Sequence, residues 1–291
     1  MKNLDVKKIN QIINNALDED LGAAGDITSN LIFDKKKLIK FQISNREKII
    51  LCGAEIVLMV FDEIAKRFNS AADLVVKRHF SDGDFLPKNS IIISGKWEIK
   101  SLLAAERVAL NFIQHLSGIA TTTNQYVEKL SNKKTKILNS RKTIPGFKIL
   151  QKYAVTVGGG VNHRFGLFDG ILIKDNHIAA SGGVENAIIL ARKNLSAQTR
   201  KMPIEIECDT INQVKEVLEI GGDIIDIIML DNMNLKQIAA AKKIIDGRAK
   251  IEVSGGINLK KIAAISKIGV DYISVGALTH SVKAADIGMD I

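Results

Sequence analysis

Cationic side chains gather around glycines in one stretch of the sequence, residues 137–178. The stretch holds six Lys or Arg residues and two acidic ones, and three successive glycines, 158–160, interrupt it. Fixed cations beside glycine and apolar residues are typical of a pocket for a ligand that carries several negative charges. A solvated basic loop is the alternative interpretation. The candidate residues of this stretch are Arg141, Lys142, His163, Arg164, Lys174 and His177.

Six apolar segments in the second half of the chain each end in polar or glycine residues. In βα barrels the active site lies at the carboxyl ends of the strands and is built from such positions. Any single polar loop needs no function, but six such ends in succession favour one shared site. The ends fall at residues 140–142, 174–177, 205–207, 231–232, 254–256 and 276–277.

Small residues follow the last two of these segments, namely Ser254, Gly255 and Gly256 and then Gly276. The backbone N–H groups of such turns can approach a ligand closely, and the next helix adds a favourable dipole. Barrels commonly bind phosphate at these two loops. The sequence has neither a Walker motif nor G-x-G-x-x-G, so an ordinary nucleotide site is not indicated. We predict a monophosphate site, with plain tight turns as the alternative.

Two carboxylates, Glu207 and Asp231, belong to the same predicted rim. They could hold sugar hydroxyls, Mg²⁺ or both, since Mg²⁺ prefers oxygen ligands. Salt bridges to nearby Lys or Arg are the alternative. Together, the cationic stretch, the phosphate turns and the carboxylate pair predict a site for a phosphorylated sugar and a polyanionic partner.

The elements that must position these residues differ between the two halves of the chain. The first part predicts a small antiparallel sheet with helices on one face. A long helical stretch follows over residues 101–130, with a break expected near Gly118, and the composition changes near residue 115. The expected helices of the first part cover residues 6–17 and 54–68, and its strands cover 38–44, 47–51, 74–79 and 91–99.

The second part alternates strands and helices at nearly regular spacing. Units of this length with Ile/Val-rich strands indicate a parallel sheet buried on both faces, and six in series favour a closed or nearly closed barrel. A segment near Val155 could supply a seventh strand. Strands are expected to start near residues 136, 170, 203, 224, 249 and 271, and helices cover 211–220, 235–245 and 259–268.

Composition restricts the class of protein. The chain has 291 residues, a formal net charge of +9 and 5% aromatic residues. The charge permits an anionic partner, but the few aromatics and the lack of a known motif disfavour nucleic acid. Cys52 and Cys208 are isolated, which favours reduced core thiols over a zinc site. We find no signal peptide and no apolar run that could span a bilayer, so we expect a cytoplasmic protein without a membrane partner.

The motifs taken together resemble the quinolinate phosphoribosyltransferase family, the decarboxylating nicotinate-nucleotide pyrophosphorylases of NAD biosynthesis. The resemblance runs nearly from end to end, and as a set its motifs are highly specific. They lie at residues 19–29, 106–121, 141–146, 158–164, 172–177, 230–232, 254–257 and 276–281.

The resemblance implies a fold, a reaction and a cofactor. The fold would be an N-terminal α/β sandwich domain over residues 1–115 and a partly open, about seven-stranded parallel βα barrel over 116–278. A C-terminal helix, 279–291, would pack back on the first domain. The reaction would join quinolinate to phosphoribosyl pyrophosphate and give nicotinate mononucleotide, pyrophosphate and CO₂. Mg²⁺ and a homodimer are also implied.

The resemblance further implies roles for individual residues. Arg107 would reach into the site of the neighbouring subunit, and Lys142, Lys174, Glu207 and Asp231 would be catalytic. Glu207 and Asp231 would face the ribose and the metal, directly or through water or substrate. Quinolinate and the diphosphate would be surrounded by Arg107, Arg141, Lys142, His163, Arg164 and Lys174, and the 5′-phosphate would be held by Ser254, Gly255, Gly256 and Gly276, with His280 nearby.

Three positions depart from the family pattern. Asn139 and Ser140 stand where the family usually has Asp and Thr, and Thr156 stands where it usually has Arg. Two alternative functions remain open. One is a relative of the same fold with another substrate, either the molybdate-associated homologue or a nicotinate phosphoribosyltransferase. The other is a barrel aldolase in which Lys142 or Lys174 forms a Schiff base.

Overall fold

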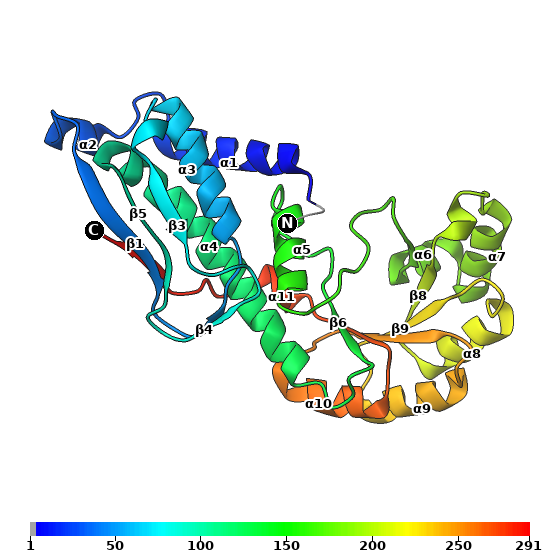
Figure 1. The fold of residues 1–291 in the computed structure, drawn as a ribbon. Helices are drawn as coiled ribbons and strands as arrows, with labels where there is room; N and C mark the ends of the chain where they lie inside the picture. The colour runs from blue at the N-terminus through cyan, green and yellow to red at the C-terminus, as the bar shows by residue number, and fades with distance from the viewer. Residues whose placement is uncertain (1–3) are drawn as a thin grey trace. The chain divides into compact units, whose positions relative to one another are not determined.

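The computed structural model describes residues 4–291 and divides into two compact units (Figure 1). The first unit runs to Asn124 and also includes Thr143–Gly159 and Leu278–Ile291. The second unit comprises Gln125–Lys142 and Gly160–Ala277. The boundary expected near residue 115 falls inside a long helix, and the compact units divide after Asn124 instead. Within residues 4–291, no helix is both long and apolar enough to span a membrane.

The first unit is built on a four-stranded antiparallel sheet in the order β12-β1-β5-β3. Helix α3 packs on this sheet through Phe61, whose ring centroid lies 5.6 Å from that of Phe41 and 5.3 Å from that of Trp97. These aromatic contacts form the centre of an otherwise aliphatic core. The elements are α1 (Val6–Leu21), α2 (Ile27–Ile32), β1 (Leu38–Asn45), β2 (Ile49–Ile50), α3 (Ala54–Arg67), η1 (Ala71–Asp73), β3 (Val75–Arg78), β4 (Phe85–Leu86), β5 (Ile91–Glu98), α4 (Ile99–Glu128), α5 (Lys148–Val157), α11 (Ala277–His280) and β12 (Ile287–Asp290).

Two expectations for this unit were wrong. Helix α4 continues through Gly118, where a Cβ atom would lie 2.2 Å from the carbonyl oxygen of Lys283. Glycine therefore serves a close backbone approach there and does not break the helix. The C-terminal segment is not a helix, because Ile287–Asp290 forms strand β12 and pairs with β1, in register from Asn45↔Ile287 to Gln42↔Asp290.

The second unit contains a parallel sheet of six strands in the order β6-β11-β10-β9-β8-β7. Helices α6 to α10 pack against one another in chain order, as expected for the outer layer of a barrel. The two strands at the edges of this sheet, β6 and β7, are not paired with each other, so the barrel is partly open. Its elements are β6 (Lys136–Leu138), β7 (Ile171–Ile173), α6 (Asp175–Ser181), α7 (Val184–Asn194), η2 (Thr199–Lys201), β8 (Ile204–Cys208), α8 (Ile211–Ile220), β9 (Ile227–Asp231), α9 (Leu235–Ile245), β10 (Lys250–Ser254), α10 (Leu259–Ile268) and β11 (Tyr272–Ser274).

The predicted class of fold, with its partly open parallel barrel, is confirmed, and the seventh strand is the exception. Val155 lies in helix α5 of the first unit, because its apolar neighbours recur at helical spacing. The nearest additional pairing is a parallel bridge between Leu138 and Val161. Side-chain caps start the helices that follow the strands; for example, Thr210 and Asn234 each form a capping box with a Gln three residues later.

Candidate active site

The carboxyl ends of the parallel strands carry the predicted residues of the second unit. Lys174 directly follows β7, Glu207 lies one residue before the end of β8, and Asp231 ends β9. Ser254 ends β10, and Arg141 and Lys142 follow β6. Since the strands are parallel, these ends lie along one edge of the sheet, as predicted.

Lys174 and Glu207 form an ion pair on this edge. The Lys174 Nζ atom lies 3.3 Å from Oε2 of Glu207, and the side chains are 46% and 9% exposed. Burial raises the pKa of Glu207, and the nearby Lys174 opposes this shift. His177 helps to orient the lysine, because its Nδ1 atom accepts a hydrogen bond of 2.9 Å from the backbone N–H of Lys174. A cation and a carboxylate are therefore held together at the barrel edge.

Three carboxylates, Glu207, Asp209 and Asp231, offer oxygen atoms that all lie within 4.8 Å of one another. Such oxygen ligands fit Mg²⁺, which is bound by a few carboxylates together with water and substrate phosphates. Asp209 was not predicted, although it stands only two residues after Glu207. Burial raises the pKa of Asp209, and the charge of Asp231 raises it further. The donor set is thus suitable for a hard divalent cation.

The predicted phosphate turn has a backbone that only glycine can adopt without strain. Gly255 has a φ of +85°, and a Cβ atom there would lie 2.3 Å from Oδ1 of Asn232. Gly256 follows with a φ of +56°. Helix α10 starts after this turn, with Asn258 as its N-cap. Lys261, which was not predicted, donates from Nζ to the carbonyl oxygen of Gly256 over 3.0 Å and places a cation beside the turn.

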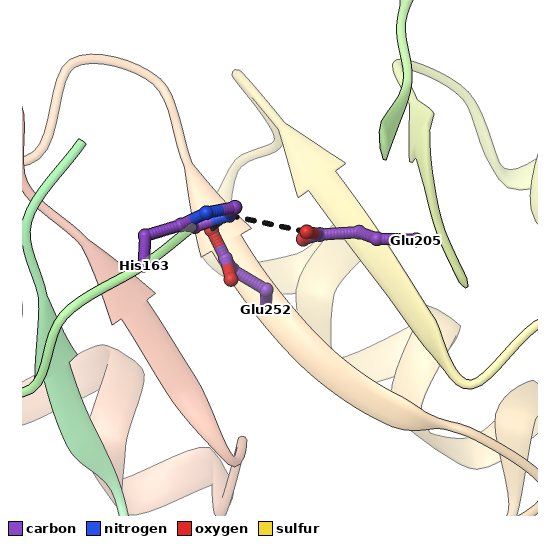
Figure 2. Close-up of side chains that lie close together, drawn as sticks. All are labelled: His163, Glu205 and Glu252. Carbon is purple, nitrogen blue, oxygen red and sulfur yellow. Dashed lines mark ion pairs between the residues drawn. The ribbon is translucent and has the colours of Figure 1, made fainter. Parts of the chain in front are cut away.

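A second cluster lies inside the barrel and was not predicted as a group (Figure 2). The Nε2 atom of His163 lies 3.1 Å from Oε2 of Glu205 and 3.7 Å from Oε1 of Glu252. Both glutamates are buried, 4% and 1% exposed. Burial raises the pKa of Glu205 to about 7, and burial together with the charge of Glu205 raises the pKa of Glu252 to about 8. The cluster borders a cavity of about 190 Å³.

The loop that carries His163 and Arg164 is held at both ends. The backbone N–H of His163 donates to Oδ1 of Asn139 over 3.1 Å, and the Nη1 atom of Arg164 donates to the carbonyl oxygen of Gly170 over 3.0 Å. Burial and the charge of Arg141 lower the pKa of Arg164. Asn139 therefore provides a side-chain oxygen that accepts a hydrogen bond from this loop. It stands where the family pattern has Asp, but it lacks the negative charge of Asp.

Gly276 follows β11 in the second unit, whereas the three residues below belong to the first unit. Arg107, on α4, is exposed and lies 3.9 Å from Oε1 of Glu106. His280 ends α11, and its Nδ1 atom is 2.6 Å from Oγ of Ser281. Thr156 lies on α5, and its hydroxyl donates to the carbonyl oxygen of Tyr153. The roles assigned to Arg107 and His280 stay predictions.

Comparison with known proteins covers almost the whole chain. Residues 26–117 match the family model of the quinolinate phosphoribosyl transferase N-terminal domain, and residues 119–290 match that of the C-terminal domain. A Bacillus subtilis protein described as a probable nicotinate-nucleotide pyrophosphorylase [carboxylating] is 41% identical over 100% of this chain and 95% of its own. The boundary between the two family models lies close to the one expected near residue 115.

Solved structures give the same result. The nicotinate-nucleotide pyrophosphorylase of Ehrlichia chaffeensis has a TM-score of 0.90 and 43% identity, with 99% of each chain covered. Human nicotinic acid phosphoribosyltransferase shares the fold alone, at a TM-score of 0.58 and 12% identity. The family resemblance of the sequence is confirmed. With both domains matched and a relative of this identity along its full length, the chain belongs to the quinolinate phosphoribosyl transferase family.

Proposed function

We propose that the protein transfers the phosphoribosyl group of phosphoribosyl pyrophosphate to quinolinate with loss of CO₂, giving nicotinate mononucleotide and pyrophosphate. One observation carries the proposal. In a chain of this family, the carboxyl ends of the strands of one parallel sheet carry three kinds of group: the cations Arg141, Lys142 and Lys174, a cluster of carboxylates, and a glycine phosphate turn.

Quinolinate is a dianion and must lose water to enter a barrel mouth. Desolvating two carboxylates is costly unless fixed cations replace the lost hydration. Arg141, Arg164 and Lys174 meet this need, and an arginine can bind a carboxylate with two parallel hydrogen bonds. The ring nitrogen of quinolinate is already a nucleophile, so the residues around it need only orient it toward C1 of the ribose.

Positive charge develops on the ribose as the bond from C1 to pyrophosphate breaks. Glu207 and Asp231 stabilise this charge in the proposed complex because they are fixed carboxylates on the same edge. Mg²⁺ bound at Glu207, Asp209 and Asp231 would neutralise charge on the pyrophosphate. The turn at Gly255 and Gly256 offers backbone N–H groups to the 5′-phosphate, which anchors the far end of the sugar.

Decarboxylation follows from the same arrangement. Once C1 is bonded to the ring nitrogen, CO₂ leaves and its bonding electron pair stays on C2, where the adjacent positive nitrogen stabilises it. C2 then takes up one proton from solvent, which gives nicotinate mononucleotide. Fixed cations hold the remaining carboxylate and the ring in place during this step. No strong base is needed, so in the proposed complex Lys174 serves as the cationic partner of Glu207 and of the substrate and not as a nucleophile.

A homodimer in the cytoplasm is part of the proposal, with Arg107 completing the site of the partner. Its support is an exposed Arg107 and an apolar loop that follows Arg164, where Leu167 and Phe168 are 73% and 72% exposed. Exposed apolar side chains gathered in one loop are typical of a contact surface. Mixing Arg107→Ala subunits with Lys174→Ala subunits should restore part of the activity, because one of the two mixed sites has both residues. No recovery after verified subunit exchange would place Arg107 in the site of its own chain.

Turnover with two acids tests the function. The purified chain with phosphoribosyl pyrophosphate and Mg²⁺ should convert quinolinate and should not convert nicotinate, which lacks the 2-carboxylate. Lys174→Met should lose most of this turnover, while Lys250→Met, on the opposite end of the sheet, should keep it. Equal turnover of both acids would contradict the proposal, and so would no turnover of either by folded protein.

A further inference from the structure

Both nitrogens of the His163 imidazole are already used by the protein. The Nδ1 atom accepts a hydrogen bond of 2.7 Å from the backbone N–H of Arg164, so it carries no proton. The Nε2 atom must then carry the proton, and it lies 3.1 Å from Oε2 of Glu205. This geometry requires one neutral tautomer. The ring therefore connects the inside of the barrel to the loop and is not available as a free cation.

The two glutamates face this ring from two strands that are separated in the sheet by β9. Glu205 comes from β8 and Glu252 from β10, and both carboxyl groups point toward the ring in Figure 2. Glu252 also accepts a hydrogen bond from the hydroxyl of Ser274 on β11. The two carboxyl groups are thus fixed by three strands, β8, β10 and β11. A strand framework is more rigid than the loop that carries His163.

Packing alone does not fix the ring. A cavity of about 190 Å³ borders His163, Arg164 and both glutamates, so the ring has room to turn if its hydrogen bonds are lost. The guanidinium of Arg164 is held by the hydrogen bond from Nη1 to the Gly170 carbonyl oxygen, while its buried Nε atom has no hydrogen-bond partner in the described part of the chain. With one such bond, its direction also depends on the position of the backbone at residue 164.

We propose that Glu205 and Glu252 are positioning residues that act through His163. Glu205 accepts the Nε2–H of the ring, and Glu252, whose Oε1 atom lies 3.7 Å from Nε2, adds a second carboxyl group on the same side of the ring. Nδ1 then stays unprotonated, accepts the Arg164 backbone N–H and so helps to aim the guanidinium. The role in substrate binding rests on the proposed function, in which Arg164 binds a carboxylate of quinolinate. The hydrogen-bond relay itself does not depend on that function.

The hydrogen-bond relay from Glu205 through His163 to the backbone of Arg164 can be tested without measuring enzyme activity. The measurement is the tautomer of the His163 ring. The chain has five histidines, so ¹⁵N-histidine labelling with His163→Gln for assignment gives a simple spectrum. We expect the neutral Nε2–H tautomer in the free protein at neutral pH. In Glu205→Leu the same ring should become a mixture of tautomers. An imidazolium, or a proton on Nδ1 in the wild type, would overturn the proposal, whatever the activity of the protein.

Kinetics then test the consequence for the substrate. Glu205→Gln keeps an oxygen acceptor and should leave the KM for quinolinate within about threefold of wild type. Glu205→Leu should raise that KM about tenfold, a loss of about 1.4 kcal/mol, while the KM for phosphoribosyl pyrophosphate changes less than about twofold. The matched control is Asp271→Leu, which removes a carboxylate that accepts the backbone N–H of Ile251 at the other end of the barrel.

Two kinetic results would overturn the positioning role. One is a rise of the KM for quinolinate and of the KM for phosphoribosyl pyrophosphate by the same factor, seen in Glu205→Leu and equally in the Asp271→Leu control. That result would indicate a general loss of structure. The other is a Glu205→Gln enzyme as impaired as Glu205→Leu, which would mean that the charge matters and the hydrogen-bond acceptor does not. If Glu205→Leu fails to fold, the tautomer measured in the wild type still decides the proposal.

Discussion

Replacing Glu252 with Gln should change how stability depends on pH. The pKa of Glu252 is about 8, compared with the ordinary 4.5, because the group is buried and lies beside Glu205. Between these two values the folded protein binds more protons than the unfolded chain. The free energy of unfolding therefore falls as pH rises from about 4.5 to about 8, and Glu252 causes no further change outside this window.

The magnitude follows from the same two values. One pKa unit corresponds to about 1.4 kcal/mol, so the difference sets an upper limit of about 5 kcal/mol for this residue. Water entry into the adjacent cavity and movement of Ser274 would relieve part of this cost. We expect about 1–3 kcal/mol between pH 5.5 and pH 8.5. Gln has no charge to bury but keeps an oxygen for the Ser274 hydroxyl, so this part of the pH dependence should disappear.

Urea unfolding of wild type and Glu252→Gln at pH 5.5, 7.0 and 8.5 measures the effect. The variant should gain relative stability as pH rises. Ser274→Ala is the companion variant, because the Ser274 hydroxyl lowers the pKa of Glu252 and its loss should steepen the fall. Parallel curves of stability against pH for wild type and Glu252→Gln would mean that the Glu252 carboxyl titrates alike in the folded and unfolded states, contrary to this prediction.

Two further predictions concern glycines. Gly118→Ala would place a Cβ atom 2.2 Å from the Lys283 carbonyl oxygen and should lower the free energy of unfolding by about 1–3 kcal/mol, measured by thermal melting; an unchanged Tm would contradict the close approach. Gly255→Ala would strain a left-handed backbone at the phosphate turn, so the KM for phosphoribosyl pyrophosphate should rise at least about tenfold. A change confined to the KM for quinolinate would place the phosphate elsewhere.

The strand–helix order of the barrel could be predicted because each unit carries its own local signals. Helices α8, α9 and α10 have the predicted bounds, and each begins at a polar N-cap that the sequence displays. The strands are short and Ile/Val-rich, and their polar ends mark the rim. Periodicity and capping are local properties, which is why one sequence is enough to find them.

Other features depend on contacts between distant residues and could not be predicted. The segment at 287–290 is a strand because β1 offers it a partner, and nothing within the segment itself signals that pairing. Glu205 and Glu252 stand two residues before predicted site residues, so the alternation of strand side chains places them in the barrel interior. What the sequence does not show is that His163 enters the same interior and meets both carboxyl groups.

Asp209 was missed for a related reason. Asp209 directly follows β8 and is the first residue of the loop that leads to α8, where an acidic side chain is common. Only the distances to Glu207 and Asp231 make it a candidate metal ligand.

The fate of the 2-carboxylate of quinolinate is the sharpest test of the proposed reaction. Quinolinate labelled with ¹³C at that carboxylate, incubated with the protein, Mg²⁺ and phosphoribosyl pyrophosphate, should release one labelled CO₂ for each pyrophosphate formed. Omitting phosphoribosyl pyrophosphate should abolish the release, because the ring nitrogen must carry the ribose, and with it a positive charge, before it can stabilise the electron pair left on C2. Release of pyrophosphate without labelled CO₂, or of CO₂ without phosphoribosyl pyrophosphate, would contradict the account.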